Sequence, residues 1–230
     1  MDFIEFERII SPKRMRRYVV AMGGDTKKAM TLYRYNLKVS QEMFTVVSCF
    51  EVALRNAIDK QLTPVFFFFW LRDSIISGGI FDNARMGETK KIIRKAYDRL
   101  NRQNNYSHSK LIAELEFGVW KYMYSSLQYR ATGQRLLSVF PNKPRSSAAM
   151  QYNNSFVFNE LDKVNSLRNR IAHHEPVCFR SNTDKVDTSY LLNEYQKIQS
   201  LFSWMGIDAR SMLYGIDHVQ NICQKINALN

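Results

Sequence analysis

The sequence has few of the residues that build turns and cross-links. Its 230 residues include only three Cys, nine Gly and five Pro. Such a composition argues against an all-β fold with many turns and against a disordered chain. The cysteines, Cys49, Cys178 and Cys223, are odd in number and lack CxxC spacing. We therefore expect neither a disulfide framework nor a structural zinc site. We also expect the protein to be located in a reducing compartment.

Several functional classes have no motif in this chain. Gly23-Gly24 and Gly78-Gly79 lack the spacing and the following Lys-Ser/Thr of a phosphate-binding loop, which argues against an ATPase or a dinucleotide enzyme. The densest apolar run, Val65–Leu71, is far shorter than the roughly 20 residues that cross a bilayer. It is expected in the core, or at an interface where exposed. Met1–Glu5 is acidic and lacks a long apolar core, so we expect no signal peptide. We expect a cytoplasmic protein without a membrane partner.

Positive charge is the outstanding feature of the composition. Lys and Arg number 33 against 21 Asp and Glu, which gives a formal net charge of +12. This excess favours a polyanionic partner, and nucleic acid or an anionic membrane surface would satisfy it equally. Hydrophobic residues make up 45 % of the chain, which is enough for the core of a single domain over residues 1–230.

Apolar residues recur at spacings of three and four along most of the chain. This pattern predicts amphipathic helices, and the expected fold class is all-α. Asp25 and Ser40 are predicted N-caps, and Pro64 is expected to end the helix that follows Ser40. The predicted helices cover residues 25–37, 40–62, 84–100, 111–123, 158–173, 191–205 and 212–226.

Three single residues carry further structural expectations. His108 is expected in the loop or cap before the fourth predicted helix. Gly118 lowers the helix propensity there, which predicts the close approach of a neighbouring helix. Ile92 is expected to face the core from the helix over residues 84–100.

One stretch, Ser166–Pro176, concentrates the groups that could perform chemistry. Asn169 and His173 stand four residues apart, so they lie on one helix face, with Arg168 at its edge. Pro176 predicts that the helix ends near His173 or His174. The negative end of the helix dipole would favour the charged imidazolium of His173.

These residue types suit the cleavage of a phosphodiester. An arginine can bind the phosphate charge, while a histidine can transfer a proton near neutral pH. The same residues could instead cap the helix and pair with Glu175. A metal site is not expected, because the adjacent His173 and His174 point about 100° apart on a helix rather than in one direction. No cofactor is expected either.

Three segments resemble known helical domains. Arg168–His173 resembles the Arg-polar-spacer-His signature of the HEPN superfamily of RNA-cleaving and nucleotide-binding domains. The longer Leu167–Pro176 resembles the version in Abi-like (abortive infection) bacterial proteins, and Phe50–Ile58 and Glu114–Trp120 resemble two further segments of that family. These segments place the resemblance over roughly residues 40–205. We expect a motif-bearing core of about residues 25–205, with 1–24 and 206–230 as extensions.

The resemblance implies a HEPN-like helical bundle with additional helices, acting as a metal-independent endoribonuclease. Arg168, Asn169 and His173 would be catalytic, and two copies of the chain would bring these residues together in a homodimer. The enzyme would serve as a toxin in phage defence, restrained by an antitoxin or released by a phage trigger. The residues that would support the site are His174, Arg170, Glu51, Arg55 and Asn56.

RNA would bind to exposed cations outside the motif. Repeated cations along one helix face neutralise successive phosphates, and a basic loop at residues 141–147 could add to them. The expected RNA-binding residues are Lys90, Lys91, Arg94, Lys95, Arg99, Arg102, Lys143 and Arg145. The alternative is a non-catalytic RNA- or protein-binding module that uses this basic surface.

Overall fold

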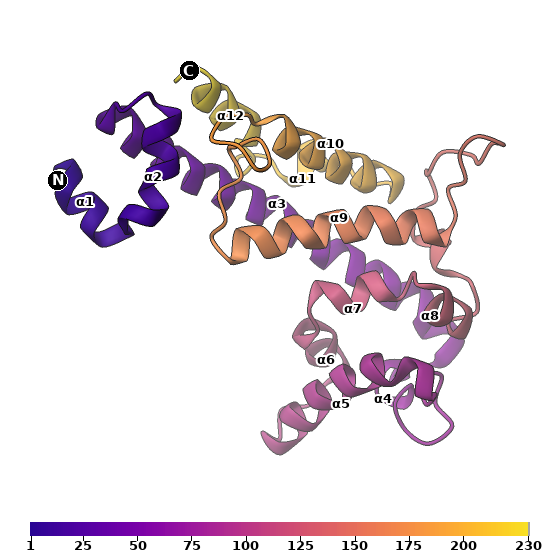
Figure 1. Cartoon of the computed structure of the whole chain (residues 1–230). Helices are drawn as coiled ribbons and strands as arrows, with labels where there is room; N and C mark the ends of the chain where they lie inside the picture. Colours follow the sequence, from indigo (N-terminus) through magenta and orange to yellow (C-terminus); the bar gives the residue numbers. More distant parts are fainter. Residues whose placement is uncertain (230) are drawn as a thin grey trace. The chain divides into compact units, whose positions relative to one another are not determined.

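The computed structural model describes residues 1–229, and within this range the chain is all-α, as predicted (Figure 1). The one pairing of extended backbone found there is an isolated bridge between Phe179 and Val186. None of the helices in this range is both long enough and apolar enough to cross a membrane.

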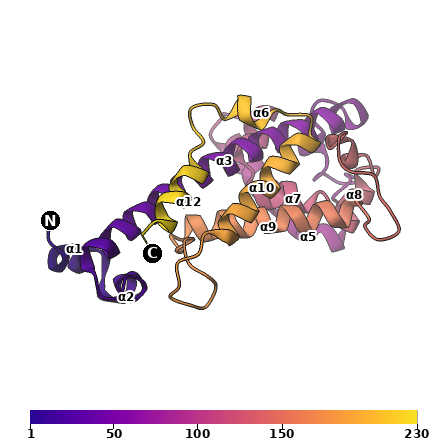
Figure 2. The ribbon, with the colours of Figure 1, turned by 90° about the horizontal axis from the view of Figure 1, so that it is seen from above.

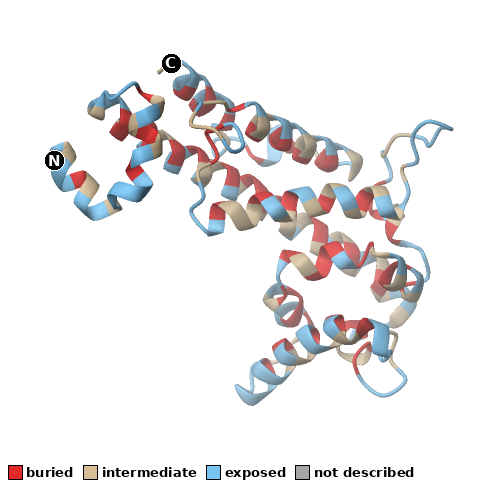
Figure 3. Cartoon of the chain, viewed as in Figure 1, coloured by how far each residue is buried: buried red, intermediate tan, exposed pale blue. Residues whose placement is uncertain are grey.

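The chain forms two compact units. Unit 1 contains Met1–Ser48, Ser166–Ser200 and the residues from Ala209 onward, and unit 2 contains Cys49–Asn165 and Leu201–Asp208. Each unit buries large apolar side chains of its own, as the buried positions along the helices show (Figure 3). Three helices contribute residues to both units, namely α3 (Thr26–Phe66), α9 (Asn154–Ala172) and α10 (Ser189–Trp204).

Unit 1 begins with two short helices, α1 (Phe3–Ile10) and α2 (Pro12–Ala21). Ser11 separates them and caps α2, because its Oγ accepts a hydrogen bond from the amide of Arg14. Pro12 occupies the first position of α2, where its missing N–H costs nothing. The chain then turns through Gly23, whose φ of 60° favours glycine.

The helix α3 corrects two predictions. Asp25 caps its start as predicted, with Oδ1 accepting from the amide of Lys28 at 2.9 Å. Ser40 does not begin a second helix: α3 continues through it, because Val39 and Met43 lie one turn apart and are both fully buried. Pro64 does not end the helix either. It lies in the last turn, where the loss of one backbone hydrogen bond is tolerated.

The C-terminal part of unit 1 contains α11 (Ala209–Met212) and α12 (Val219–Asn227). The prediction of a single helix over residues 212–226 is therefore wrong, because a turn at Gly215 (φ 77°) separates the two helices. The helix α12 lies beside the first half of α3 (Figure 2). Before α12, the amide of His218 donates to Glu42 at 3.0 Å, and after it, the carbonyl of Leu229 accepts from Lys28 at 3.5 Å.

Unit 2 is built from short helices around parts of α3 and α9. They are α4 (Trp70–Asp73), α5 (Gly87–Arg102), α6 (His108–Glu114), α7 (Phe117–Tyr122) and α8 (Ser126–Ala131), with 3-10 turns at Ala84–Met86 and Leu136–Val139. On α5, Ile93 and Leu100 are buried as predicted, whereas Ile92 is 46 % exposed. The inward orientation predicted for Ile92 was wrong.

The helix predicted over residues 111–123 is two helices in the structure. Leu115 is extended (φ −84°, ψ 134°) and separates α6 from α7. This break allows both Leu115 and Phe117 to be buried. A Cβ placed on Gly118 would meet no atom within 4 Å, so the predicted close approach of a helix at this glycine is wrong.

The aromatic run that follows α3 is buried only at its end. Phe67 (φ 66°) and Phe68 are 80 % and 59 % exposed, whereas Trp70 and Leu71 are buried. His108 is also buried, as the first residue of α6, and its Nε2 lies 2.8 Å from the Oδ1 of Asp59. The prediction of a loop or cap position for His108 was wrong, because Ser107 is the cap and His108 is the buried first residue of the helix. Its partner Asp59, 49 residues away in sequence, could not be read from the local pattern.

Candidate active site

The motif stretch ends α9 in a Schellman motif, a C-terminal turn closed by two reversed hydrogen bonds. His174 adopts the left-handed conformation (φ 55°) that such a turn requires. The amide of His174 donates to the carbonyl of Ile171, and the amide of Glu175 donates to the carbonyl of Arg170, both at 2.9 Å. The helix therefore ends within one residue of the predicted position, and Pro176 follows the turn directly.

Arg170 closes this turn with its side chain. Its Nε lies 3.4 Å from Glu175 Oε2, and its Nη2 donates to the carbonyl of Pro176 at 3.0 Å. The guanidinium also lies 5.0 Å from the centre of the Tyr190 ring. Arg170 therefore stabilises the loop, and Glu175 pairs with this arginine.

The three proposed catalytic residues lie together at the end of α9 in unit 1. The amide of His173 donates to the carbonyl of Asn169 at 2.9 Å, so the two residues are one helical turn apart as predicted. Arg168 Nη1 reaches Asn169 Oδ1 at 3.5 Å. Arg168 and Asn169 are half-buried, whereas His173 and His174 are exposed. The arrangement places an exposed histidine one helical turn from an asparagine whose side chain contacts an arginine.

Residues far away in sequence hold the loop that follows His173. The buried Asn36 of α3 accepts a hydrogen bond from the amide of Val177 at 2.9 Å. Arg14 of α2 donates from Nη2 to the carbonyl of His174. Sequence reasoning did not find either contact, since each partner lies more than 140 residues away.

A second arginine of α2 holds the same loop further along. Arg17 donates from Nε to the carbonyl of Thr183 at 3.1 Å and lies 3.4 Å from Asp184 Oδ1. Its guanidinium also lies 4.3 Å from the centre of the Phe179 ring. Arg14 and Arg17 of α2 thus anchor the chain on the C-terminal side of the motif.

Cys178 in this loop does not provide a nucleophile. Its side chain is fully buried, and burial raises the pKa of its thiol to about 12. A thiol with this pKa stays protonated at neutral pH, whereas the thiolate is the reactive form.

The predicted supporting residues on α3 belong to unit 2. Arg55 is half-buried, and its Nη1 donates to the carbonyl of Ala113 at 3.5 Å. Glu51 is half-buried as well, and Asn56 is exposed. The contact of Arg55 joins α3 to α6, which is a structural role within unit 2.

Most of the cations on α5 have partners in unit 2. Lys90 pairs with Asp82 at 2.6 Å, and Lys91 lies 3.8 Å from Glu88. Arg99 forms an ion pair with a carboxylate of α6. These pairs reduce the net positive charge of the cationic face of α5.

The remaining cations of the expected RNA surface differ in exposure and contacts. Arg94 donates to the carbonyl of Ile75 at 2.6 Å, and Arg102 donates to that of Asp98 at 3.3 Å. Three further cations of the expected surface are exposed or half-buried: Lys95, Lys143 and Arg145.

The chain matches the model of the Abi-like protein family over residues 3–178. It therefore belongs to the Abi-like family, which suggests a role in abortive infection. The match includes α1 and α2 together with the first residues of the loop that follows α9. No curated protein and no solved structure matches the chain.

Proposed function

We propose that this Abi-like protein is a metal-independent endoribonuclease of the HEPN type that acts in phage defence. The observation that carries this proposal is the end of α9, where the exposed His173 lies one helical turn from Asn169, whose side chain contacts Arg168. The Schellman turn fixes the backbone at this point, so the imidazole is presented from a rigid position.

The proposed reaction uses the 2′-hydroxyl of the RNA as the nucleophile. The 2′-oxygen attacks the adjacent phosphorus, the bond to the 5′-oxygen breaks, and the products are a 2′,3′-cyclic phosphate and a 5′-hydroxyl. His173 takes the proton from the 2′-hydroxyl or gives one to the leaving oxygen. Arg168 stabilises the negative charge that builds up on the phosphate, and Asn169 orients His173 or the phosphate.

A second copy of the chain would complete the site. One imidazole cannot both accept and donate a proton in the same step, whereas two copies related by a two-fold axis would supply two. We therefore propose a homodimer in which the ends of two α9 helices meet. Sedimentation analysis of the purified protein tests this directly, and a monomer that cleaves RNA would contradict it.

Cleavage by purified variants tests the proposed activity. We expect His173→Ala to lower the cleavage rate about 10²- to 10⁴-fold, the usual contribution of general acid–base catalysis. Arg168→Gln should also lower it strongly, whereas Arg16→Gln, the same change at an exposed arginine of α2, should not. Equal RNA degradation by wild type and His173→Ala would contradict the proposal. His174→Asn, which tolerates the left-handed backbone, shows whether the second histidine takes part.

Bacterial growth separates this proposal from the binding-module alternative. If the protein is a toxic nuclease, induction should stop growth, and His173→Ala and Arg168→Gln should both abolish that effect. If growth inhibition instead survives these two changes and is lost with Lys95→Gln, a helical binding module becomes the better description. An antitoxin or a phage protein that restores or triggers the effect would be the expected partner.

A further inference from the structure

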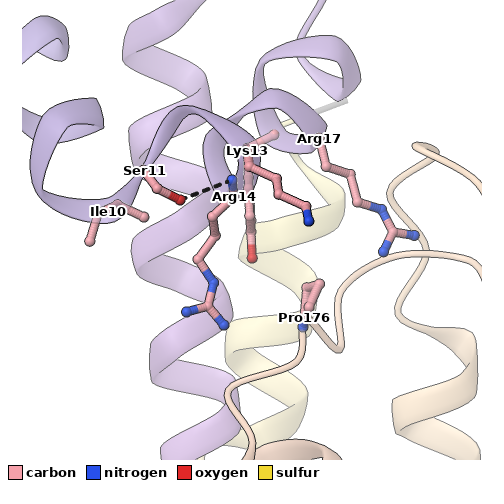
Figure 4. Close-up of a pocket in the computed structure, with 7 residues that line it drawn as sticks. Ile10, Ser11, Lys13, Arg14, Arg17 and Pro176 are labelled. Carbon is pink, nitrogen blue, oxygen red and sulfur yellow. Dashed lines mark hydrogen bonds between the residues drawn. The ribbon is translucent and has the colours of Figure 1, made fainter.

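A cavity of about 410 Å³ lies between α2 and the loop that follows α9 in unit 1. Three cations line it from α2, namely Lys13, Arg14 and Arg17, and Pro176 lines it from the loop. Figure 4 shows the side chains of Lys13 and Arg14 extending from α2 toward the loop that carries Pro176. Cations therefore line one side of this cavity, and Pro176 places it next to the proposed catalytic turn.

The three cations differ in what their side chains already do. Arg17 lies 3.4 Å from Asp184, so a carboxylate balances its charge and its role is to hold the loop. Arg14 is bound to the carbonyl of His174, which is a neutral acceptor. A guanidinium has five N–H donors, so Arg14 keeps its charge and further donors after making this bond. Lys13 is exposed.

The position of these cations in α2 is unfavourable unless an anion lies nearby. Lys13 and Arg14 occupy the first turn of the ten-residue α2, where the helix dipole is positive, and no acidic residue lies in that turn. A bound anion would offset the repulsion between the dipole and the cations.

We propose that Lys13 and Arg14 bind a phosphate of the RNA substrate that neighbours the phosphate being cleaved. The location follows from Arg14, which contacts His174, the residue adjacent to the proposed proton-transfer residue His173. An RNA strand at His173 would therefore run past α2. This subsite rests on the proposed endoribonuclease function for its substrate, and Arg14 has a second role in holding the His174 carbonyl.

Equilibrium binding of RNA tests the subsite without interference from cleavage. The probe is a short fluorescein-labelled single-stranded RNA of mixed sequence, bound to the full-length His173→Ala protein at several salt concentrations. The plot of the logarithm of the binding constant against the logarithm of the salt concentration has a negative slope. One lost phosphate contact makes this slope shallower by about 0.7 and weakens binding about fivefold at about 0.1 M salt. We expect this from Lys13→Gln, and we expect Lys13→Arg to retain the wild-type slope.

Arg16→Gln is the matched control, because Arg16 is an exposed cation of the same helix that does not line this cavity. It should leave the salt slope unchanged. The subsite proposal is overturned if Lys13→Gln and Arg16→Gln give the same slope, or if the His173→Ala protein does not bind the RNA. Binding to anionic lipid vesicles that depends on Lys13, without Lys13-dependent binding to RNA, would overturn it as well.

Failure of the subsite and failure of the endoribonuclease give different results. If wild type cleaves RNA and Lys13→Gln changes neither the salt slope nor KM, the subsite is wrong and the activity stands. If wild type does not cleave RNA while Lys13→Gln still lowers the salt slope, the phosphate site stands and the activity is wrong. If both proposals hold, Lys13→Gln raises KM more than it lowers kcat.

Discussion

Asp59 connects three elements of unit 2, and its replacement by alanine should destabilise the protein strongly. Its Oδ1 lies 2.7 Å from Nε1 of Trp70 and 2.8 Å from Nε2 of His108, which belong to α4 and α6. Both residues are at least 97 % buried, with 1 % and 3 % of their surface exposed. Both groups therefore use Asp59 as their acceptor inside unit 2.

The expected cost follows from the two buried groups that lose this acceptor; the half-buried hydroxyl of Thr63, 3.3 Å from the same oxygen, loses it as well. A buried polar group left without a partner costs about 1–3 kcal/mol. Asp59→Ala leaves two such groups, so the free energy of unfolding should fall by about 2–6 kcal/mol. Urea denaturation followed by circular dichroism measures this change.

Asp98→Ala is the matched control for this measurement. Asp98 is exposed on α5, and the change gives the same gain in helix propensity as Asp59→Ala does on α3. The difference between the two variants therefore reports the buried contacts alone. If Asp59→Ala destabilises the protein no more than Asp98→Ala does, the contacts of Asp59 do not stabilise unit 2.

The same contacts predict a dependence on pH. Burial opposes the ionisation of Asp59, but the hydrogen bonds from His108 and Trp70 outweigh it and hold the pKa of the carboxyl below its ordinary value. A carboxyl with a lowered pKa stabilises the fold above its unfolded pKa of about 4 and loses that contribution as the pH falls further. The stability difference between wild type and Asp59→Ala should therefore shrink below about pH 4.

Three further predictions concern single residues. Asn36→Ala removes the acceptor for the buried amide of Val177 and should lower the free energy of unfolding by about 1–3 kcal/mol, measured by urea denaturation. Gly118→Ala should raise it by up to about 1 kcal/mol, because the added Cβ meets no atom within 4 Å in a helix that favours alanine; a loss of stability would contradict the open space at this position. Cys49, which is half-buried, should react with iodoacetamide at neutral pH well before the buried Cys178, as peptide mass spectrometry of the native protein would show.

Local signals in the sequence predicted the helices but not where each one stops. The apolar spacing gave the fold class and most of the buried positions. Ser40 looks like an N-cap in isolation, yet the buried neighbours Val39 and Met43 keep α3 helical through it. At Leu115 the opposite happens: a good helix former is extended, because the break buries two side chains. In both cases packing against other elements outweighs local propensity.

The candidate site was predictable as far as it depends on neighbours in sequence. The spacing of Asn169 and His173 and the position of Pro176 predicted the helix end to within one residue. The residues that hold this end were not predictable, because Arg14 and Asn36 act from 160 and 141 residues away. The local sequence around a cationic or amide side chain does not indicate which distant backbone carbonyl or N–H group it will contact in the fold.

The contacts of the loop after His173 join the proposed catalytic turn to α2. The buried amide of Val177 must have a partner, and the side chain of Asn36 provides it. Arg14 and Arg17 add hydrogen bonds to the more exposed carbonyls of His174 and Thr183. Any movement of α2 that breaks the bond from Arg14 would release the carbonyl of His174, whose left-handed backbone holds the Schellman turn. An RNA phosphate at Lys13 and Arg14 would keep α2 in place, so substrate binding and the position of His173 would stabilise each other.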